Sequence, residues 1–125
     1  PYTDLSDKRL RFGKKYVTIK QDVNANGPLK MGFDLIDGQV YYVLGDNVFS
    51  KKYQNNHPNG NYPDNNVSFE TYTDNVMIEI ENLSEVKNVA PGECNTMSET
   101  WTLTKKPCEV DLKNDASIDN LISKI

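Results

Sequence analysis

The chain has 125 residues, which is enough for one hydrophobic core of ordinary domain size. Its formal charge of −4 excludes a basic, phosphate-tracking surface, so we expect no nucleic-acid partner. No apolar run approaches the ~20 residues that cross a bilayer, so we expect no membrane partner either. A first residue other than Met fits a processed product or an excised domain.

Short segments of alternating apolar and polar residues follow one another along the chain, separated by clusters of Gly, Pro, Asn and Asp. This pattern is typical of antiparallel sheets. We expect strands at residues 16–20, 29–33, 39–44, 48–53, 67–73, 76–83 and 97–104. The sequence therefore predicts an all-β fold, an antiparallel β-sandwich, in a single domain over residues 1–125.

Two segments depart from this alternation. Residues 54–66 form a long irregular loop that contains His57, the only histidine, and loops of this length are often functional. At the C-terminus, Ile118, Leu121 and Ile125 recur at helical spacing. They predict a short helix over residues 115–125 that packs against the sheet.

The two cysteines lie on either side of the predicted strand at residues 97–104. A strand of this length would hold Cys94 and Cys108 roughly 30 Å apart at ~3.3 Å per residue. That is beyond disulfide reach unless the chain doubles back, so free thiols are favoured. With one histidine and no Cys-x-x-Cys pair, the sequence predicts no metal site, and we expect no cofactor.

Acidic side chains recur on the predicted strands. By alternation, Glu79 and Glu81 share one face of their strand, and Glu70 points the same way as Tyr72. Such acids commonly pair with Lys, Arg or backbone amides, which is the structural interpretation. Carboxylates beside aromatic rings also suit a sugar, because acids bind hydroxyl groups and rings stack on its C–H surface. Trp101 is expected in the core rather than at such a site.

From Pro28 onward, the order of several short pieces resembles the galactose-mutarotase-like, or aldose-epimerase-like, β-sandwich family. The pieces are Pro28-Leu29-Lys30-Met31-Gly32, Tyr62-Pro63-Asp64, Ser68-Phe69-Glu70-Thr71-Tyr72-Thr73, Met77-Ile78-Glu79-Ile80-Glu81-Asn82-Leu83-Ser84, Pro91-Gly92-Glu93 and Glu99-Thr100-Trp101-Thr102-Leu103. No single piece is diagnostic, and the specificity lies in their order.

The resemblance implies a larger supersandwich whose concave sheet binds carbohydrate, with this chain as its C-terminal portion. Such a portion needs a partner for its exposed sheet edges, either a homodimer mate or a missing N-terminal half. In the family, a carboxylate acts as general base on the anomeric hydroxyl and a histidine as general acid. The resemblance gives the base role to Glu79 or Glu81, and His57 is the only candidate acid.

Three functions remain open on this sequence. The first is a carbohydrate-binding domain, or a piece of a mutarotase-like isomerase, with Glu79 and Glu81 as catalytic candidates. Its ligand-binding candidates are Glu70, Tyr72, Trp101 and His57. The second is a non-catalytic structural or interaction module in which these acids are paired and the aromatic side chains are buried. The third, a hydrolase with two carboxylates, requires a defined separation between them.

Overall fold

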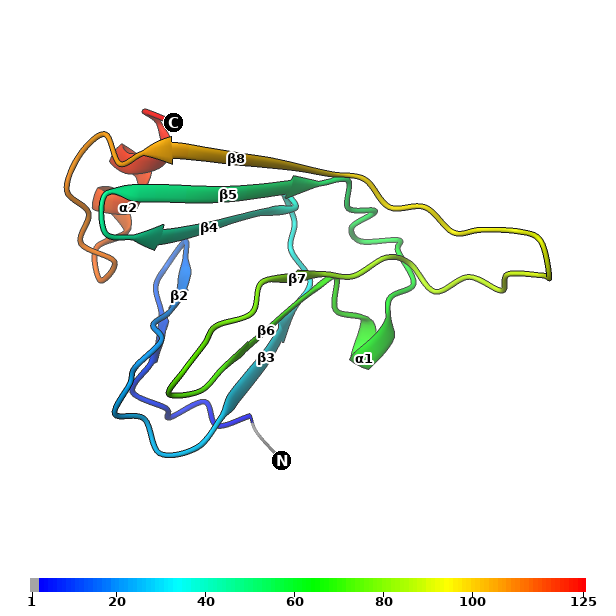
Figure 1. The fold of residues 1–125 in the computed structure, drawn as a ribbon, viewed down its shortest axis with the longest axis horizontal. Coiled ribbons are helices and arrows are strands. Elements are labelled where there is room, and N and C mark those ends of the chain that lie inside the picture. Colours follow the sequence, from blue (N-terminus) through cyan, green and yellow to red (C-terminus); the bar gives the residue numbers. More distant parts are fainter. Residues whose placement is uncertain (1–2) are drawn as a thin grey trace.

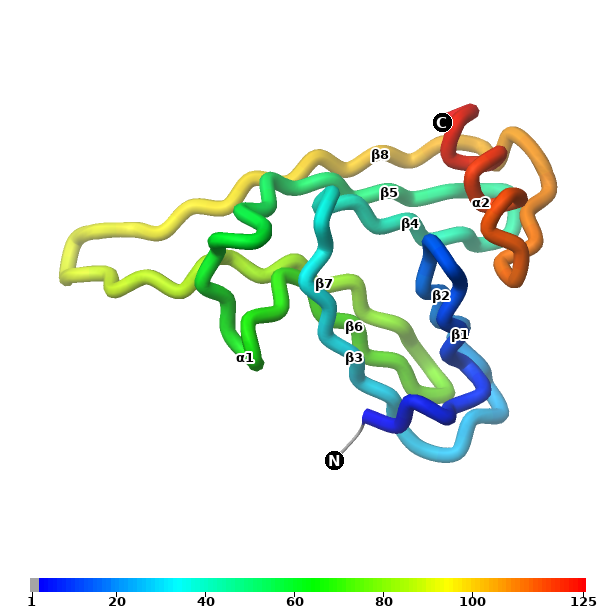
Figure 2. The backbone as a smooth tube through the Cα atoms, turned by 180° about the vertical axis from the view of Figure 1, so that it is seen from behind, coloured from blue at the N-terminus to red at the C-terminus, as the bar shows by residue number. Residues whose placement is uncertain are grey.

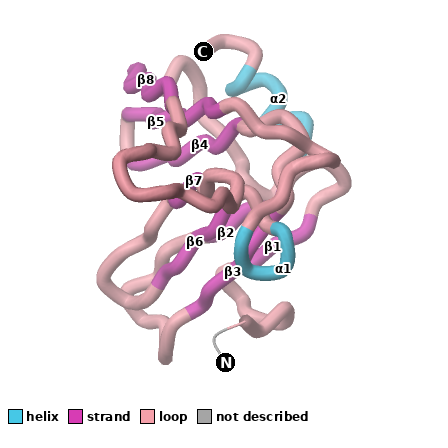
Figure 3. The backbone as a smooth tube through the Cα atoms, turned by 90° about the vertical axis from the view of Figure 1, so that its right-hand side faces the viewer, coloured by secondary structure: helices cyan, strands magenta, loops and turns pink. Residues whose placement is uncertain are grey.

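The structure is a computed structural model that describes residues 3–125. In these residues eight strands form three antiparallel sheets, and a short helix follows them at the C-terminus (Figure 1). This confirms the prediction of an all-β, antiparallel fold, and the arrangement is consistent with a sandwich. Figure 3 shows two of the sheets as separate layers, one above the other.

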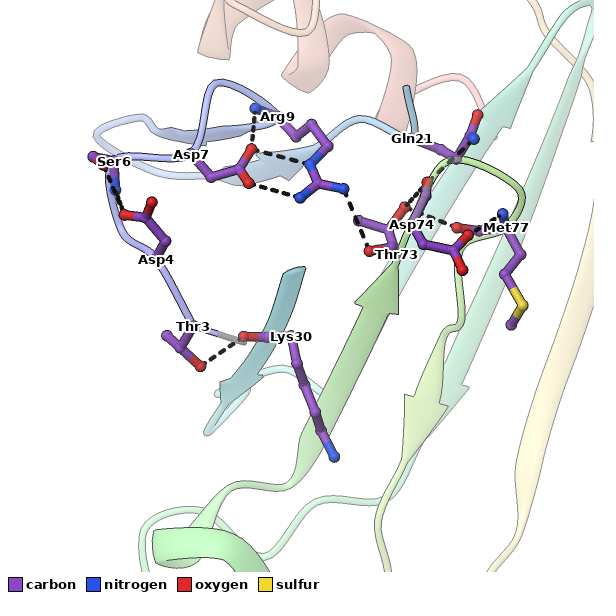
Figure 4. A network of polar contacts seen from close by, with 10 residues as sticks. All are labelled: Thr3, Asp4, Ser6, Asp7, Arg9, Gln21, Lys30, Thr73, Asp74 and Met77. Atoms are coloured by element: carbon purple, nitrogen blue, oxygen red, sulfur yellow. Dashed lines mark hydrogen bonds and ion pairs between the residues drawn. The ribbon is translucent and has the colours of Figure 1, made fainter. Parts of the chain in front are cut away.

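The N-terminal sheet, sheet A, is the hairpin of β1 (Leu10–Phe12) and β2 (Val17–Ile19). The sequence predicted β2, within residues 16–20, but did not predict β1. Arg9, which precedes β1, anchors this segment to the rest of the fold. Its buried guanidinium bonds the Asp7 carboxylate at 2.7 Å and donates to the Thr73 carbonyl at 3.4 Å (Figure 4).

Sheet B has the order β3 (Leu29–Phe33), β6 (Phe69–Thr73) and β7 (Glu81–Asn82). β3 has the predicted bounds, whereas β7 is much shorter than the predicted strand at residues 76–83. The preceding segment nevertheless runs antiparallel to β6, because Thr73 and Ile78 form an isolated bridge. The predicted strand at residues 76–83 is therefore regular only at Glu81–Asn82, although the whole segment lies beside β6.

Sheet C has the order β4 (Gln39–Leu44), β5 (Asn47–Tyr53) and β8 (Glu99–Lys105). All three strands lie within one or two residues of their predicted bounds. The predicted hairpin between β4 and β5 is present, with Leu44 opposite Asn47. One face of sheet C looks toward sheet B, since the Lys51 ammonium donates to the Ile80 carbonyl at 3.0 Å.

The C-terminal helix α2 (Asp115–Ile122) confirms the predicted helix, although it ends three residues before the chain does. The Asn114 side chain caps it by accepting the Ala116 N–H at 3.0 Å. Ile118 and Leu121 are buried, as their helical spacing predicted. On its polar side, the Asp115 carboxylate bonds Arg11 of the N-terminal hairpin at 3.0 Å, so the helix joins the two ends of the chain.

The short element α1 (Pro63–Asn66), within the predicted loop at residues 54–66, is a left-handed turn rather than a regular helix. Asp64, Asn65 and Asn66 have φ values of 49°, 66° and 67°. Asp and Asn tolerate this region better than other residues with a side chain, because their polar groups bond locally. Here the Asn66 amide oxygen accepts the Tyr62 N–H at 2.8 Å.

The core is small and lies between the layers and beneath the helix. Its buried hydrophobic side chains are Leu29, Met31, Val48, Tyr53, Tyr62, Phe69, Ile118 and Leu121. The buried Tyr53 hydroxyl donates a hydrogen bond to the Ser68 carbonyl at 3.0 Å. Between β7 and β8 the chain leaves this core as a long arm, seen in yellow in Figures 1 and 2, on which Val86 and Val89 are exposed.

Candidate functional site

Four of the six predicted site residues lie on one face of sheet B. Glu70 and Tyr72 are two residues apart on β6, so their side chains point to the same face of the sheet. The register between β3 and β6 places Lys30 opposite Tyr72. On the other side of β6, Glu81 stands opposite Glu70, and the Glu79 N–H donates to the Tyr72 carbonyl at 2.7 Å. Directly opposed residues of an antiparallel pair point to the same face. We call these five residues, Lys30, Glu70, Tyr72, Glu79 and Glu81, the acidic face.

The centre of the acidic face is an ion pair between Lys30 and Glu70. The ammonium lies 2.7 Å from Oε2 of Glu70, whose side chain is buried although it stands on the outer side of the sheet. This hydrogen bond raises the pKa of Lys30, and the charges of Asp64 and Glu81 add to the effect. Glu79 is half-buried and Glu81 is exposed, so two carboxylates remain open beside a fixed cation.

Threonine hydroxyls hold the segment that carries Glu79. The Thr71 hydroxyl donates to the Glu79 carbonyl at 2.6 Å, and the Thr73 hydroxyl donates to the Met77 carbonyl at 2.8 Å. These bonds reach from the buried face of β6 to carbonyls of the irregular segment, and the Met77 carbonyl also accepts the Asp74 N–H at 3.1 Å. Strand register therefore positions Lys30 beside Glu70 and Tyr72, and the threonine hydroxyls of β6 help to position the segment that carries Glu79.

A second polar cluster lies between the layers and consists of Lys51, Asn82, Glu99 and Trp101; we call it the interlayer cluster. Lys51 Nζ is 3.3 Å from Oε1 of Glu99, and the Asn82 amide donates to the same oxygen at 2.7 Å. The Trp101 indole donates to the other carboxylate oxygen at 2.6 Å. All donors to Glu99 thus come from side chains, and three strands meet on one carboxylate.

The prediction that Trp101 belongs to the core is wrong, because its side chain is 66% exposed. β8 is the edge strand of sheet C, so no neighbouring strand covers the ring. Its indole N–H donates to Glu99, and the Lys51 ammonium lies 5.6 Å from the ring centroid.

Asn82 carries the one buried side-chain atom in residues 3–125 that has no hydrogen-bond partner, its Oδ1.

The interlayer cluster predicts a pH dependence of stability. Burial alone would raise the pKa of Glu99, but hydrogen bonds from Trp101, Lys51 and Asn82 and the charge of Lys51 outweigh it and lower that pKa. A lowered pKa contributes stability above the unfolded value, about 4.3 for Glu. This contribution is lost as the pH falls through the folded value.

We therefore expect Glu99→Gln to lower the free energy of unfolding at pH 7, and the difference from the wild type to shrink toward pH 3. Urea denaturation at both pH values measures this. Glu109→Gln is the control, because Glu109 is an exposed acid with a single surface pair to Lys106. An equal difference at both pH values for Glu99→Gln would contradict the assigned role.

The only histidine pairs with Asp34, the residue that follows β3. His57 Nδ1 is 2.5 Å from the Asp34 carboxylate, and the other oxygen of Asp34 accepts the Ser68 hydroxyl at 3.3 Å. Ser68 is fully buried and its hydroxyl also accepts the Leu35 N–H at 3.0 Å. The sequence could not show this partner of His57, because Asp34 lies 23 residues earlier in the chain.

A concave surface lies on sheet C, on the face opposite to Lys51 and Trp101. It is a groove of about 170 Å³ between Tyr41, Ser50 and the threonines Thr100 and Thr102, with Ile122 near the end of α2 beside it. This volume is well below the ~300 Å³ of typical small-molecule pockets.

Comparison with known proteins adds no identity: no family model, no curated protein and no solved structure matches the chain. Across residues 3–125, no group of three or more His, Cys, Asp or Glu side chains is arranged to hold a metal ion. None of the helices described there has the length and apolarity needed to cross a bilayer. Cys94 is exposed, Cys108 is half-buried, and both are free thiols.

Reasoning from the sequence alone missed the cations of both clusters. Lys30 and Lys51 stand in ordinary alternating strands, and nothing local distinguishes them from solvated lysines. Strand register could have identified Lys30: once residues 29–33 pair with residues 69–73, Lys30 lies beside Glu70 and Tyr72. Trp101 and His57, which were expected to join the same site, lie in the interlayer cluster and in the loop instead.

Proposed function

We propose that this chain is a carbohydrate-binding domain that holds a sugar against its acidic face. The supporting observation is the gathering of three carboxylates, one ammonium and one aromatic ring on a single face of sheet B. Ionised carboxylates accept hydroxyl hydrogen bonds, and an ammonium donates them. Tyr72 offers a ring for the apolar C–H surface of a pyranose. The family resemblance in the sequence points to the same class of ligand.

Sugar binding is the first role of the acidic face, and catalysis on the bound sugar would be a second. A mutarotase-type reaction needs a base at the anomeric hydroxyl and an acid at the ring oxygen. Glu79 and Glu81 are the candidate bases, since they flank the Lys30–Glu70 pair on the open side. His57, whose Nδ1 is held by Asp34, is the candidate acid.

Single substitutions test the assignment to the acidic face. We expect Glu79→Gln and Glu81→Gln each to weaken sugar binding roughly tenfold, since a hydrogen bond to a charged group contributes about 1.5 kcal/mol or more. Glu109→Gln removes an exposed acid elsewhere and should bind as the wild type does. Ligand-detected NMR with monosaccharides and glycans measures the affinities. Binding that persists in both variants would remove these residues from the site.

A second candidate function, a non-catalytic interaction module, is favoured by one observation. Trp101 and Leu103 are 66% and 71% exposed on the edge strand β8, where aromatic and aliphatic side chains suit a protein partner better than water. In that case the acidic face would be a solvated surface. A protein that associates through β8 and binds no sugar would support this alternative.

A further inference from the structure

The free edge of sheet C is a complete, regular strand. β8 pairs with β5 without a bulge, from Lys105 opposite Asn47 to Glu99 opposite Tyr53. Beyond β8, in residues 3–125, no further strand is bonded to this sheet. Figure 1 shows the strand along the outer side of the molecule. Seven residues of backbone are therefore available for pairing on one side.

The backbone groups that point to this free edge can be assigned. The Lys106 N–H donates to the Asp46 carbonyl at 2.8 Å, and in an antiparallel pair bonded positions alternate along the strand. The even-numbered residues of β8 consequently bond β5. The odd-numbered residues, Glu99, Trp101, Leu103 and Lys105, direct their N–H and C=O groups outward.

The side chains of this edge lack the usual protection against pairing. Natural edge strands carry central lysines, prolines or bulges. In β8 both charges stand at the ends, with Glu99 at one and Lys105 at the other, and no proline intervenes. Trp101 and Leu103 occupy the middle of the same face and are the exposed pair described above.

We propose that β8 pairs with β8 of a second copy of this chain, antiparallel about a two-fold axis at Thr102. In this register Glu99 lies opposite the partner's Lys105, and Trp101 lies opposite the partner's Leu103. Opposite charges and aromatic–aliphatic pairs both stabilise cross-strand neighbours. The Glu99 carboxylate would then have the partner's Lys105 as a further cation beside its own Lys51. The odd-numbered residues face one another as bonded pairs, so all the outward backbone groups are satisfied. The contact is closed and the same on both copies.

Other registers and the other edge fit less well. A shift of two residues places Glu99 opposite the partner's Leu103, or Trp101 opposite the partner's Lys105, and loses the charge match. A shift of one residue places the outward N–H and C=O groups of one copy opposite residues of the other copy whose N–H and C=O groups already bond β5. The opposite edge of the sheet, β4, has no charged residue and offers no electrostatic match.

Disulfide cross-linking tests the register. Thr102→Cys, in a chain that also carries Cys94→Ser and Cys108→Ser, would place two thiols at a non-bonded pair on the axis, about 4.5 Å apart at Cα. This spacing lies within disulfide reach. Thr100→Cys in the same background is the control, since its two copies would be offset by four residues, about 13 Å. We expect covalent dimers with the first variant and not with the second.

Analytical ultracentrifugation tests the association itself. We expect a concentration-dependent dimer, and we expect Lys105→Glu to raise its dissociation constant roughly tenfold, since both ends then oppose like charges. Lys52→Glu, an exposed lysine on the other face of sheet C, should leave it unchanged. A monomer throughout, a dimer indifferent to Lys105→Glu, or equal cross-linking at residues 100 and 102 would overturn the proposal. None of these outcomes depends on sugar binding.

Discussion

Lys51→Met is expected to lower the free energy of unfolding by about 3 kcal/mol, because it removes a buried cation from an ion pair. Lys51 is only 7% exposed and its ammonium bonds the Ile80 carbonyl and the Glu99 carboxylate. Removing it leaves Glu99, itself mostly buried, without its cation. An uncompensated buried charge costs more than the pair itself contributes.

Lys52→Met is the matched control, because the adjacent lysine points to the opposite face of β5 and is exposed. It should change stability by less than about 0.5 kcal/mol. In the double variant Lys51→Met/Glu99→Gln, the effects should be less than additive, since the second change removes the charge that the first leaves unpaired. Additive effects, or equal losses at the two lysines by urea denaturation, would show that no ion pair joins the layers.

Leu121→Ala is expected to destabilise the protein by about 3 kcal/mol, because it removes a side chain that is 2% exposed and leaves a cavity beneath α2. The loss should exceed that of Leu5→Ala, since Leu5 is 65% exposed. Thermal or urea unfolding of both variants measures the difference. Similar values for the two leucines would mean that the C-terminal helix does not dock on the sheet.

Two strands have the bounds that the sequence predicted. Residues 29–33 and 39–44 have the bounds that the pattern gave, since turn residues mark both ends of each segment. The segment at residues 76–83 was read as one strand, but only Glu81–Asn82 is regular. Threonine hydroxyls of β6 add to the few backbone bonds of this segment, and no sequence pattern predicts such side-chain bonds.

The acidic face was predictable as far as alternation within a strand determines it. Glu70 with Tyr72, and Glu79 with Glu81, follow from a period of two residues. That the two pairs stand together depends on the antiparallel pairing of β6 with the segment that follows it, which alternation alone does not give. Trp101 could not be placed in this way. Whether an aromatic residue lies on an edge or in the centre of a sheet depends on strand order, and alternation carries no information about order.

The most direct test of the central claim is to map sugar binding by amide chemical shifts on the full chain. Monosaccharides and glycans would be added to labelled protein, with anomer exchange followed in the same samples. We expect shifts at Lys30, Tyr72, Glu79 and Glu81, and accelerated exchange if the carboxylates also act as bases. No shifts with any sugar, or shifts confined to the groove beside Tyr41 and Thr102, would contradict a carbohydrate site on the acidic face.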